Sequence, residues 1–170
     1  PCTVLTITNN TAGGQPVSMK NIRETAELCR RYRIPLLIDS ARFAENAYFI
    51  KTREAGYTDK TIKEIVREIY QYADIMTISA KKDGVVNMGG FVAMRSEELM
   101  RQAMQFSIMC EGYLTYGGMS GRDLDALAVG LDENTEFDNL ETRIKQVEYL
   151  AKICFTASRS SSISCSSAQA

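Results

Sequence analysis

Short apolar runs alternate with amphipathic stretches along the chain, a pattern typical of α/β proteins. Val4–Thr8 is rich in β-branched residues, and Ile34–Asp39 is an apolar run that ends in a carboxylate. Both segments are predicted to be buried strands. Asp74–Ser79 and Gly90–Met94 are predicted to be two further strands.

Apolar side chains recur at helical spacing between these strands. Ser18 is predicted to cap the first helix, whose apolar stripe begins at Met19. Further helices are predicted from about Phe43, from Thr61 to Ala73, from Ser96 and across most of residues 121–154. The order of strands and helices therefore predicts a largely parallel sheet flanked by helices.

Polar side chains stand at the carboxyl ends of three predicted strands. Asn10 follows the first strand, Asp39 ends the second, and Ser79–Lys82 ends and follows the third. In open α/β sheets, ligands bind outside the carboxyl ends of the strands. These residues are therefore predicted to meet at one edge of the sheet and to form the functional site.

The composition narrows the chemistry that such a site can perform. The chain of 170 residues has no histidine, which excludes histidine-based nucleophilic catalysis and histidine-ligated metal sites within it. A net charge of −1 shows no excess of basic residues of the kind that binds nucleic acid or an anionic membrane. No apolar run is long enough to cross a bilayer, and the five scattered cysteines fit a cytoplasmic protein with reduced thiols. Acid–base chemistry would depend on lysine, tyrosine, a carboxylate or a cofactor.

Each candidate residue also has a purely structural interpretation. Lys82, placed after a strand, can form a Schiff base with a carbonyl cofactor, but an isolated Lys-Lys-Asp turn is more typical of a solvated loop. Asp39 can hold a protonated pyridine nitrogen, or it can pair with Arg42 and cap the next helix. Gly13–Gly14 can approach a phosphate before a helix or form an ordinary turn. Taken singly, these residues leave the choice open.

Several longer strings together resemble one family, the tryptophanases and tyrosine phenol-lyases, which are pyridoxal-phosphate-dependent β-eliminating lyases. The resemblance runs from about residue 3 to residue 151. Its markers are Ala12–Ser18, Glu45–Lys51, Lys81–Asp83, Tyr116–Gly118, Gly121–Arg122, Ala128–Leu131 and Arg143–Val147. The resemblance implies an incomplete large domain of the pyridoxal-phosphate-dependent transferase fold (aspartate aminotransferase fold type I), with a mostly parallel sheet flanked by helices.

The family pattern implies roles for the residues at the predicted strand ends. Lys82 would be the catalytic lysine and would bind pyridoxal 5'-phosphate covalently. Ser79 and Lys81 would help to hold the cofactor phosphate, and Asp39 would pair with the pyridine nitrogen. These roles favour the functional interpretation of each residue over the structural one.

The same pattern implies further contacts and partners. Asn10 and Arg42 would approach the phenolic oxygen of the cofactor ring. The backbone of Asn87 would be a ligand of a monovalent cation, K⁺ or NH₄⁺. The substrate would be a small amino acid, and the complete protein would be a homotetramer.

Two strings favour tryptophanase over tyrosine phenol-lyase within this family. Ser40–Asn46 has alanine before its arginine, where the phenol-lyase pattern has threonine. Ser79–Lys82 has alanine before its lysine pair, where the phenol-lyase pattern has glycine. The implied reaction is the β-elimination of L-tryptophan to indole, pyruvate and ammonium. The alternative is the elimination of phenol from L-tyrosine.

The resemblance also implies that this chain is a fragment. Residues 1–154 are expected to form part of the cofactor-binding large domain, and the serine-rich residues 155–170 a disordered tail. The family's N-terminal phosphate-binding loop and C-terminal small domain have no counterpart in the sequence, so little or no turnover is expected from the chain alone. Two other hypotheses remain: another pyridoxal-phosphate enzyme such as an aminotransferase, against which Glu45–Lys51 argues, and a non-catalytic remnant that binds no cofactor.

Overall fold

The computed structural model describes residues 1–113 and 118–166, with side chains as far as residue 156. The strands are β1 (Thr3–Thr6), β2 (Leu36–Asp39), β3 (Ile75–Ser79) and β4 (Gly90–Met94). The helices are the short 3-10 turn η1 (Asn10–Ala12), α1 (Met19–Tyr32), α2 (Phe43–Arg53), α3 (Ile62–Gln71), α4 (Glu97–Cys110), α5 (Gly121–Glu133) and α6 (Phe137–Ser166). Each strand predicted from the sequence is present.

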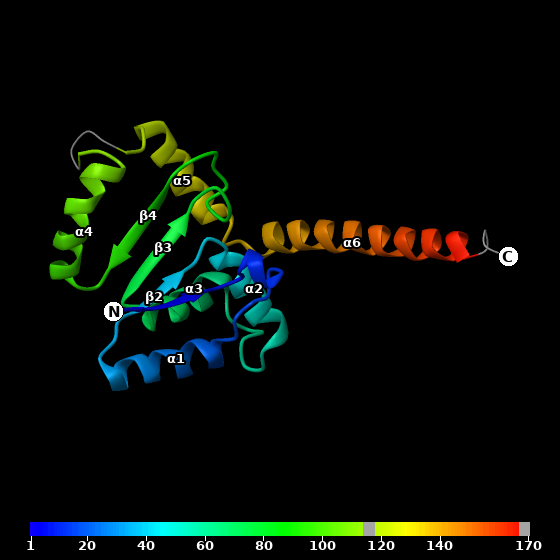
Figure 1. Cartoon of the computed structure of the whole chain (residues 1–170), viewed down its shortest axis with the longest axis horizontal. Coiled ribbons are helices and arrows are strands. Elements are labelled where there is room, and N and C mark those ends of the chain that lie inside the picture. The colour runs from blue at the N-terminus through cyan, green and yellow to red at the C-terminus, as the bar shows by residue number, and fades with distance from the viewer. Residues whose placement is uncertain (114–117, 167–170) are drawn as a thin grey trace.

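The four strands form one sheet in the order β1-β2-β3-β4 (Figure 1). β1, β2 and β3 run parallel, and β4 is antiparallel to β3. Parallel neighbours need a long crossover, which α1 provides between β1 and β2, and α2 with α3 between β2 and β3. The prediction of an α/β fold with a largely parallel sheet is confirmed.

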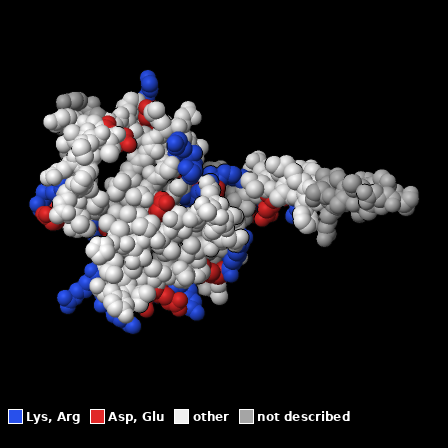
Figure 2. Space-filling model, viewed as in Figure 1, with Lys and Arg blue, Asp and Glu red and all other residues white. Residues whose placement is uncertain are grey.

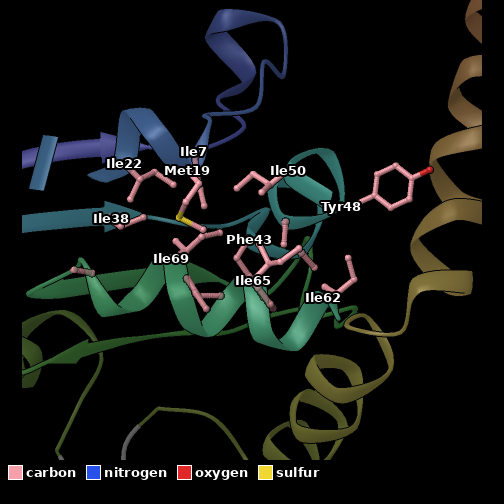
Figure 3. Close-up of a cluster of buried hydrophobic side chains, with 14 of the residues drawn as sticks. Ile7, Met19, Ile22, Ile38, Phe43, Tyr48, Ile50, Ile62, Ile65 and Ile69 are labelled. Carbon is pink, nitrogen blue, oxygen red and sulfur yellow. The ribbon is translucent and has the colours of Figure 1, made fainter. Parts of the chain in front are cut away.

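An apolar core joins the sheet to α1, α2, α3 and the first turns of α6. Figure 3 shows Ile22 of α1, Ile38 of β2 and Ile65 of α3 with their side chains gathered between these elements. All three side chains are fully buried. Burial of such large aliphatic groups is the main favourable contribution to folding, so this cluster stabilises the part of the sheet that carries the site.

Helix α1 shows how the apolar pattern separates core from solvent. Its buried residues include Met19 and Ile22, on the stripe that the sequence predicts. Its opposite face is charged: Figure 2 shows basic and acidic side chains together along the lower edge of the molecule, over α1. Lys20 and Glu24 form an exposed ion pair there at 3.8 Å.

Side-chain caps define where the helices begin. Ser18 Oγ accepts a hydrogen bond from the backbone N–H of Asn21 at 3.1 Å, which confirms the predicted cap of α1. At α3, Thr61 and Glu64 form a reciprocal capping box. The helix predicted over Thr61–Ala73 therefore begins one residue later than its first predicted position, because Thr61 is the cap.

The predicted helical stretch across residues 121–154 is divided into α5 and α6 by a short turn at 134–136. Asn134 is buried in this turn, and its Nδ2 donates to the carbonyl oxygen of Asp83 at 2.9 Å. The turn is thus fixed to the loop that follows β3. The sequence did not predict this break, because its cause is a contact with a distant segment.

Helix α6 packs on α2 through its first turns and then extends away from the rest of the protein (Figure 1). Leu140 is fully buried, and the rings of Phe137 and Tyr48 stack with centroids 5.3 Å apart. The helical backbone continues through residues 155–166, whereas the disorder expected for residues 155–170 in solution stays a prediction. Within the described part of the chain, no helix has both the length and the apolar composition needed to cross a bilayer.

Candidate active site

A group of polar side chains shares one face of the sheet at the carboxyl ends of β1, β2 and β3. The strand register pairs Thr6 with Asp39, and Asp39 with Thr77. Side chains alternate between the two faces along a strand, so these three residues and Ser79 lie on the same face. Ile38, the neighbour of Asp39, belongs to the core on the opposite face. The polar group therefore lies on the face of the sheet opposite the core.

Hydroxyl groups from the two neighbouring strands orient Asp39. Thr77 Oγ1 donates to Asp39 Oδ1 at 3.2 Å, and Thr6 Oγ1 makes a long contact of 3.5 Å with Oδ2. Asp39 remains partly exposed, so its carboxylate is oriented and still accessible to a ligand. Sequence alone did not single out Thr6 and Thr77, because threonine is common in strands and only the register reveals its neighbours.

Lys82 lies in the loop after β3, beside the hydroxyl group of Ser79. Its Nζ donates to Ser79 Oγ at 3.1 Å, so the structure brings these two predicted site residues together. The backbone N–H of Val85 donates to the carbonyl oxygen of Lys82 at 3.1 Å, and Val85 has φ 54, which β-branched residues rarely adopt. Such a strained conformation persists only where surrounding contacts fix the loop. Lys81, by contrast, is exposed.

Two other predicted residues lie near this edge. Arg42 is the N-cap of α2, and its Nε lies 3.6 Å from Glu45 Oε2. Asn10 is exposed in η1 after β1. Among the described residues, no hydrogen bond joins Arg42 or Asn10 to Asp39 or Lys82. Of the predicted set, only Ser79 and Lys82 are joined by a hydrogen bond.

The predicted cation ligand, Asn87, is exposed in the same loop as Lys82. Its role stays a prediction. The described residues include no group of three or more His, Cys, Asp or Glu that could hold a metal ion. Tyr116 and Gly117, which belong to one of the family strings, lie outside the described residues.

A network of charged residues beside Lys82 was not predicted. Asp83 is fully buried and pairs with Arg143 of α6, with Oδ1 and Nη2 2.9 Å apart. Arg143 Nη2 also lies 3.0 Å from Glu45 Oε1. Burial raises the pKa of the Glu45 carboxyl and Asp83 raises it further, against the lowering effects of Arg143 and Arg42. The sequence gives no signal for this network, because Asp83 and Arg143 are 60 residues apart.

Two solved structures have a similar fold. A protein described as an L-allo-threonine aldolase from Listeria monocytogenes EGD-E matches with a TM-score of 0.63 and 18% identity, over 89% of this chain and 37% of that chain. A protein described as an aromatic amino acid β-eliminating lyase/threonine aldolase from Exiguobacterium sp. 255-15 matches with a TM-score of 0.54 and 22% identity, over 78% of this chain and 32% of that chain. These matches confirm the predicted fold type, of which this chain is an incomplete large domain.

Sequence relatives agree with this fold. A Trichomonas vaginalis protein described as a probable β-eliminating lyase is 68% identical over 89% of this chain and 33% of its own length. A tryptophanase of Salinibacter ruber is 54% identical, and a tyrosine phenol-lyase of Lacrimispora saccharolytica 47%, each over 89% of this chain and 32% of its own length. The chain thus spans about a third of the length of the curated relatives it matches. The sequence model of the Beta-eliminating lyase family matches residues 1–157, and the chain therefore belongs to the β-eliminating lyase family.

Proposed function

We propose that this chain is a central part of a pyridoxal-phosphate-dependent lyase that eliminates indole from L-tryptophan, giving pyruvate and ammonium. The observation that carries the proposal is the placement of Lys82, Ser79 and Asp39 at the carboxyl edge of the sheet in a chain of this family. An amine, a hydroxyl group and an oriented carboxylate together fit the functional groups of pyridoxal phosphate. Their types and positions support binding of this cofactor.

Each group has a distinct part in holding the cofactor. Lys82 Nζ would bind it covalently, and Asp39, oriented by Thr77, would accept a hydrogen bond from the protonated ring nitrogen. Ser79 and Lys81 would donate to the phosphate. When bound, pyridoxal phosphate supplies an electron sink for bond breaking beside the α-carbon of an amino acid.

The ring oxygen and the substrate proton require further groups. Arg42 and Asn10 would approach the phenolic oxygen of the ring. Lys82 Nζ would accept the proton from the substrate α-carbon. Its neighbour Ser79 Oγ, at 3.1 Å, is placed to hold the amine between these two tasks.

Tryptophan is favoured over tyrosine as the substrate by two observations. Ala41 before Arg42 and Ala80 before the lysine pair have the tryptophanase form. The matched proteins described as tryptophanase or probable tryptophanase are 49–54% identical to this chain, and those described as tyrosine phenol-lyase are 47–49% identical. Little or no turnover is expected from the chain alone. Indole and phenol release by the complete protein are assayed side by side, and release of phenol but not indole would contradict this choice.

Covalent trapping of the cofactor tests the proposal without any need for turnover. Purified chain is incubated with pyridoxal phosphate, reduced with borohydride, digested and analysed by mass spectrometry. The adduct is expected on Lys82 and is expected to be lost in Lys82→Ala. Lys20→Ala, which removes a lysine whose side chain is 80% exposed on α1, is expected to keep it. Equal labelling of many lysines, or none of Lys82, would favour a remnant that does not bind cofactor.

The proposal extends to the cellular compartment, the oligomeric state and the bound cation of the complete protein. We place it in the cytoplasm as a homotetramer, with K⁺ or NH₄⁺ bound at the backbone of Asn87. The free state of the cysteines in the described part of the chain, Cys2, Cys29, Cys110 and Cys154, supports a reducing compartment. Asn87 is exposed in the loop after β3.

A further inference from the structure

Asp83, the residue after Lys82, is a fully buried carboxylate held by two other elements. Its Oδ2 accepts hydrogen bonds from the backbone N–H groups of Ala44, at 2.7 Å, and Glu45, at 3.2 Å, in the first turn of α2. Its Oδ1 pairs with Arg143 Nη2 of α6 at 2.9 Å. A buried charge is strongly disfavoured without such partners, so these bonds fix the position of Asp83.

The main chain of Asp83 is fixed as firmly as its side chain. Its backbone N–H donates to the carbonyl oxygen of Ala41 at 3.2 Å, and its carbonyl oxygen accepts from Asn134 Nδ2 at 2.9 Å. The next residue, Gly84, lies against α5 so closely that a Cβ on Gly130 would stand 2.0 Å from the Gly84 carbonyl oxygen. The loop therefore has little freedom to shift directly after Lys82.

The segment to which Asp83 is bonded carries the opposite side of the candidate site. Asp39 ends β2, and Arg42 is the N-cap of α2. The bonds from Asp83 to residues 41, 44 and 45 thus join the backbone of Lys82 to the backbone of this segment. They hold together the two backbone segments from which the Lys82 amine and the Asp39 carboxylate extend.

Arg143 extends this connection to a second charged residue. Its guanidinium contacts both Asp83 and Glu45, and Glu45 in turn contacts Arg42 at 3.6 Å. Both contacts are made by Nη2, whereas the buried Nε has no hydrogen-bond partner. Arg143 therefore links α6 both to the Lys82 loop and to the first turn of α2.

We propose that Asp83 and Arg143 are positioning residues that hold Lys82 at the correct distance from Asp39 for the cofactor, an inference that rests on the proposed function. Neither residue need touch the cofactor. They act through the loop and through the start of α2.

The test compares three variants of the full chain, each checked for folding by circular dichroism. Arg143→Met keeps the length of the side chain but leaves Asp83 without its cation. Arg143→Lys keeps the charge without the planar fork. Lys63→Met is the matched control, because it removes another pairing between elements, Lys63 with Asp132 and Glu136, away from the Lys82 loop.

Two readouts are measured well below the melting temperature of each variant. The first is the dissociation constant for pyridoxal phosphate, from its visible absorbance and from borohydride trapping on Lys82. We expect it to rise about tenfold or more in Arg143→Met, less in Arg143→Lys and not at all in Lys63→Met. The second is the pH profile of trace acylation of the Lys82 amine in the absence of cofactor, which should change in Arg143→Met and not in Lys63→Met.

The two proposals fail in different ways. If the parent chain gives no adduct on Lys82, the proposed function is wrong, and the acylation profile still decides whether Arg143 controls the position of Lys82. If folded Arg143→Met keeps the parent's dissociation constant and acylation profile, the positioning role is overturned while the cofactor site stands. If Arg143→Met does not fold, Asp83→Asn, which removes the charge of Asp83 and keeps its size, is measured in the same way, and parent-like values in that variant also overturn the positioning role.

Discussion

Helices α3 and α4 are both predicted from the sequence, yet only α3 has a buried face. Ile62, Ile65 and Ile69 of α3 are buried against the core. Every residue of α4 is described and none is buried; the side chains of Phe106 and Met109 are 65% and 77% exposed. Helical periodicity therefore predicts the helix. Whether its apolar side is buried depends on whether another segment packs against it.

The same contrast divides the whole protein into two regions. The packed region comprises β1 to β3 with α1 to α3, and the exposed region comprises β4, α4 and the outer part of α6. The candidate site lies at their boundary, because Asp39 ends a strand of the packed region while Lys82 lies in the loop that leads to β4. Stability should therefore depend mostly on the packed region, and cofactor binding on the contacts at the boundary.

The largest expected effect sharpens the contrast between the two helices. Ile65→Ala removes a fully buried side chain and should lower the free energy of unfolding by about 3 kcal/mol, from lost burial and the cavity that remains. Phe106→Ala deletes a larger but exposed side chain and should change it by less than about 0.5 kcal/mol. Urea unfolding followed by circular dichroism measures both. Similar losses in the two variants would show that α4 is covered in solution and that the two regions do not differ.

The next effect concerns a polar residue inside the packed region. Asn46 Oδ1 accepts from the Val17 N–H at 2.8 Å and from Thr8 Oγ1 at 3.1 Å, and its Nδ2 donates to the Val17 carbonyl oxygen at 3.0 Å. Asn46→Ala leaves these groups without their partner and should cost about 2 kcal/mol in the same unfolding measurement. Asn139→Ala, the control, removes one exposed hydrogen bond and should cost less than about 0.5 kcal/mol. Equal costs would mean that water replaces Asn46 in the core.

The features predicted correctly from the sequence are those set by neighbours along the chain. The strand ending at Asp39 and the cap at Ser18 depend on short-range pattern and local hydrogen bonds. The position of Lys82 beside Ser79 was also predictable, because both follow from one strand end.

The features that the sequence did not predict depend on contacts between distant segments. Thr6 and Thr77 reach Asp39 only through the register of three strands. Asp83 and Arg143 meet only because α6 packs on the start of α2. The exposure of α4 has the same origin, since burial requires a partner that periodicity within one helix does not specify.

The smallest expected effect is a pH dependence at the boundary between the two regions. Burial raises the pKa of Glu45 and Asp83 raises it further, while Arg143 and Arg42 lower it, and the net result is a pKa above the ordinary value of 4.5. A carboxyl whose pKa is higher in the folded chain binds its proton more tightly there. Its contribution to the free energy of unfolding therefore increases as the pH falls through the folded pKa, and it is complete below 4.5.

Glu45→Gln removes this titration and makes the effect measurable. Relative to Glu45→Gln, the parent chain should gain stability as the pH is lowered from neutral to about 4.5, and the difference should then level off. Urea unfolding across this range gives the difference, and Asn139→Ala, which changes no titratable group, should follow the parent at every pH. If the parent instead loses stability relative to Glu45→Gln as the pH falls, the ion pairs of Glu45 with Arg143 and Arg42 outweigh its burial. The boundary would then be held together by charge attraction, as the packed region is by apolar contact.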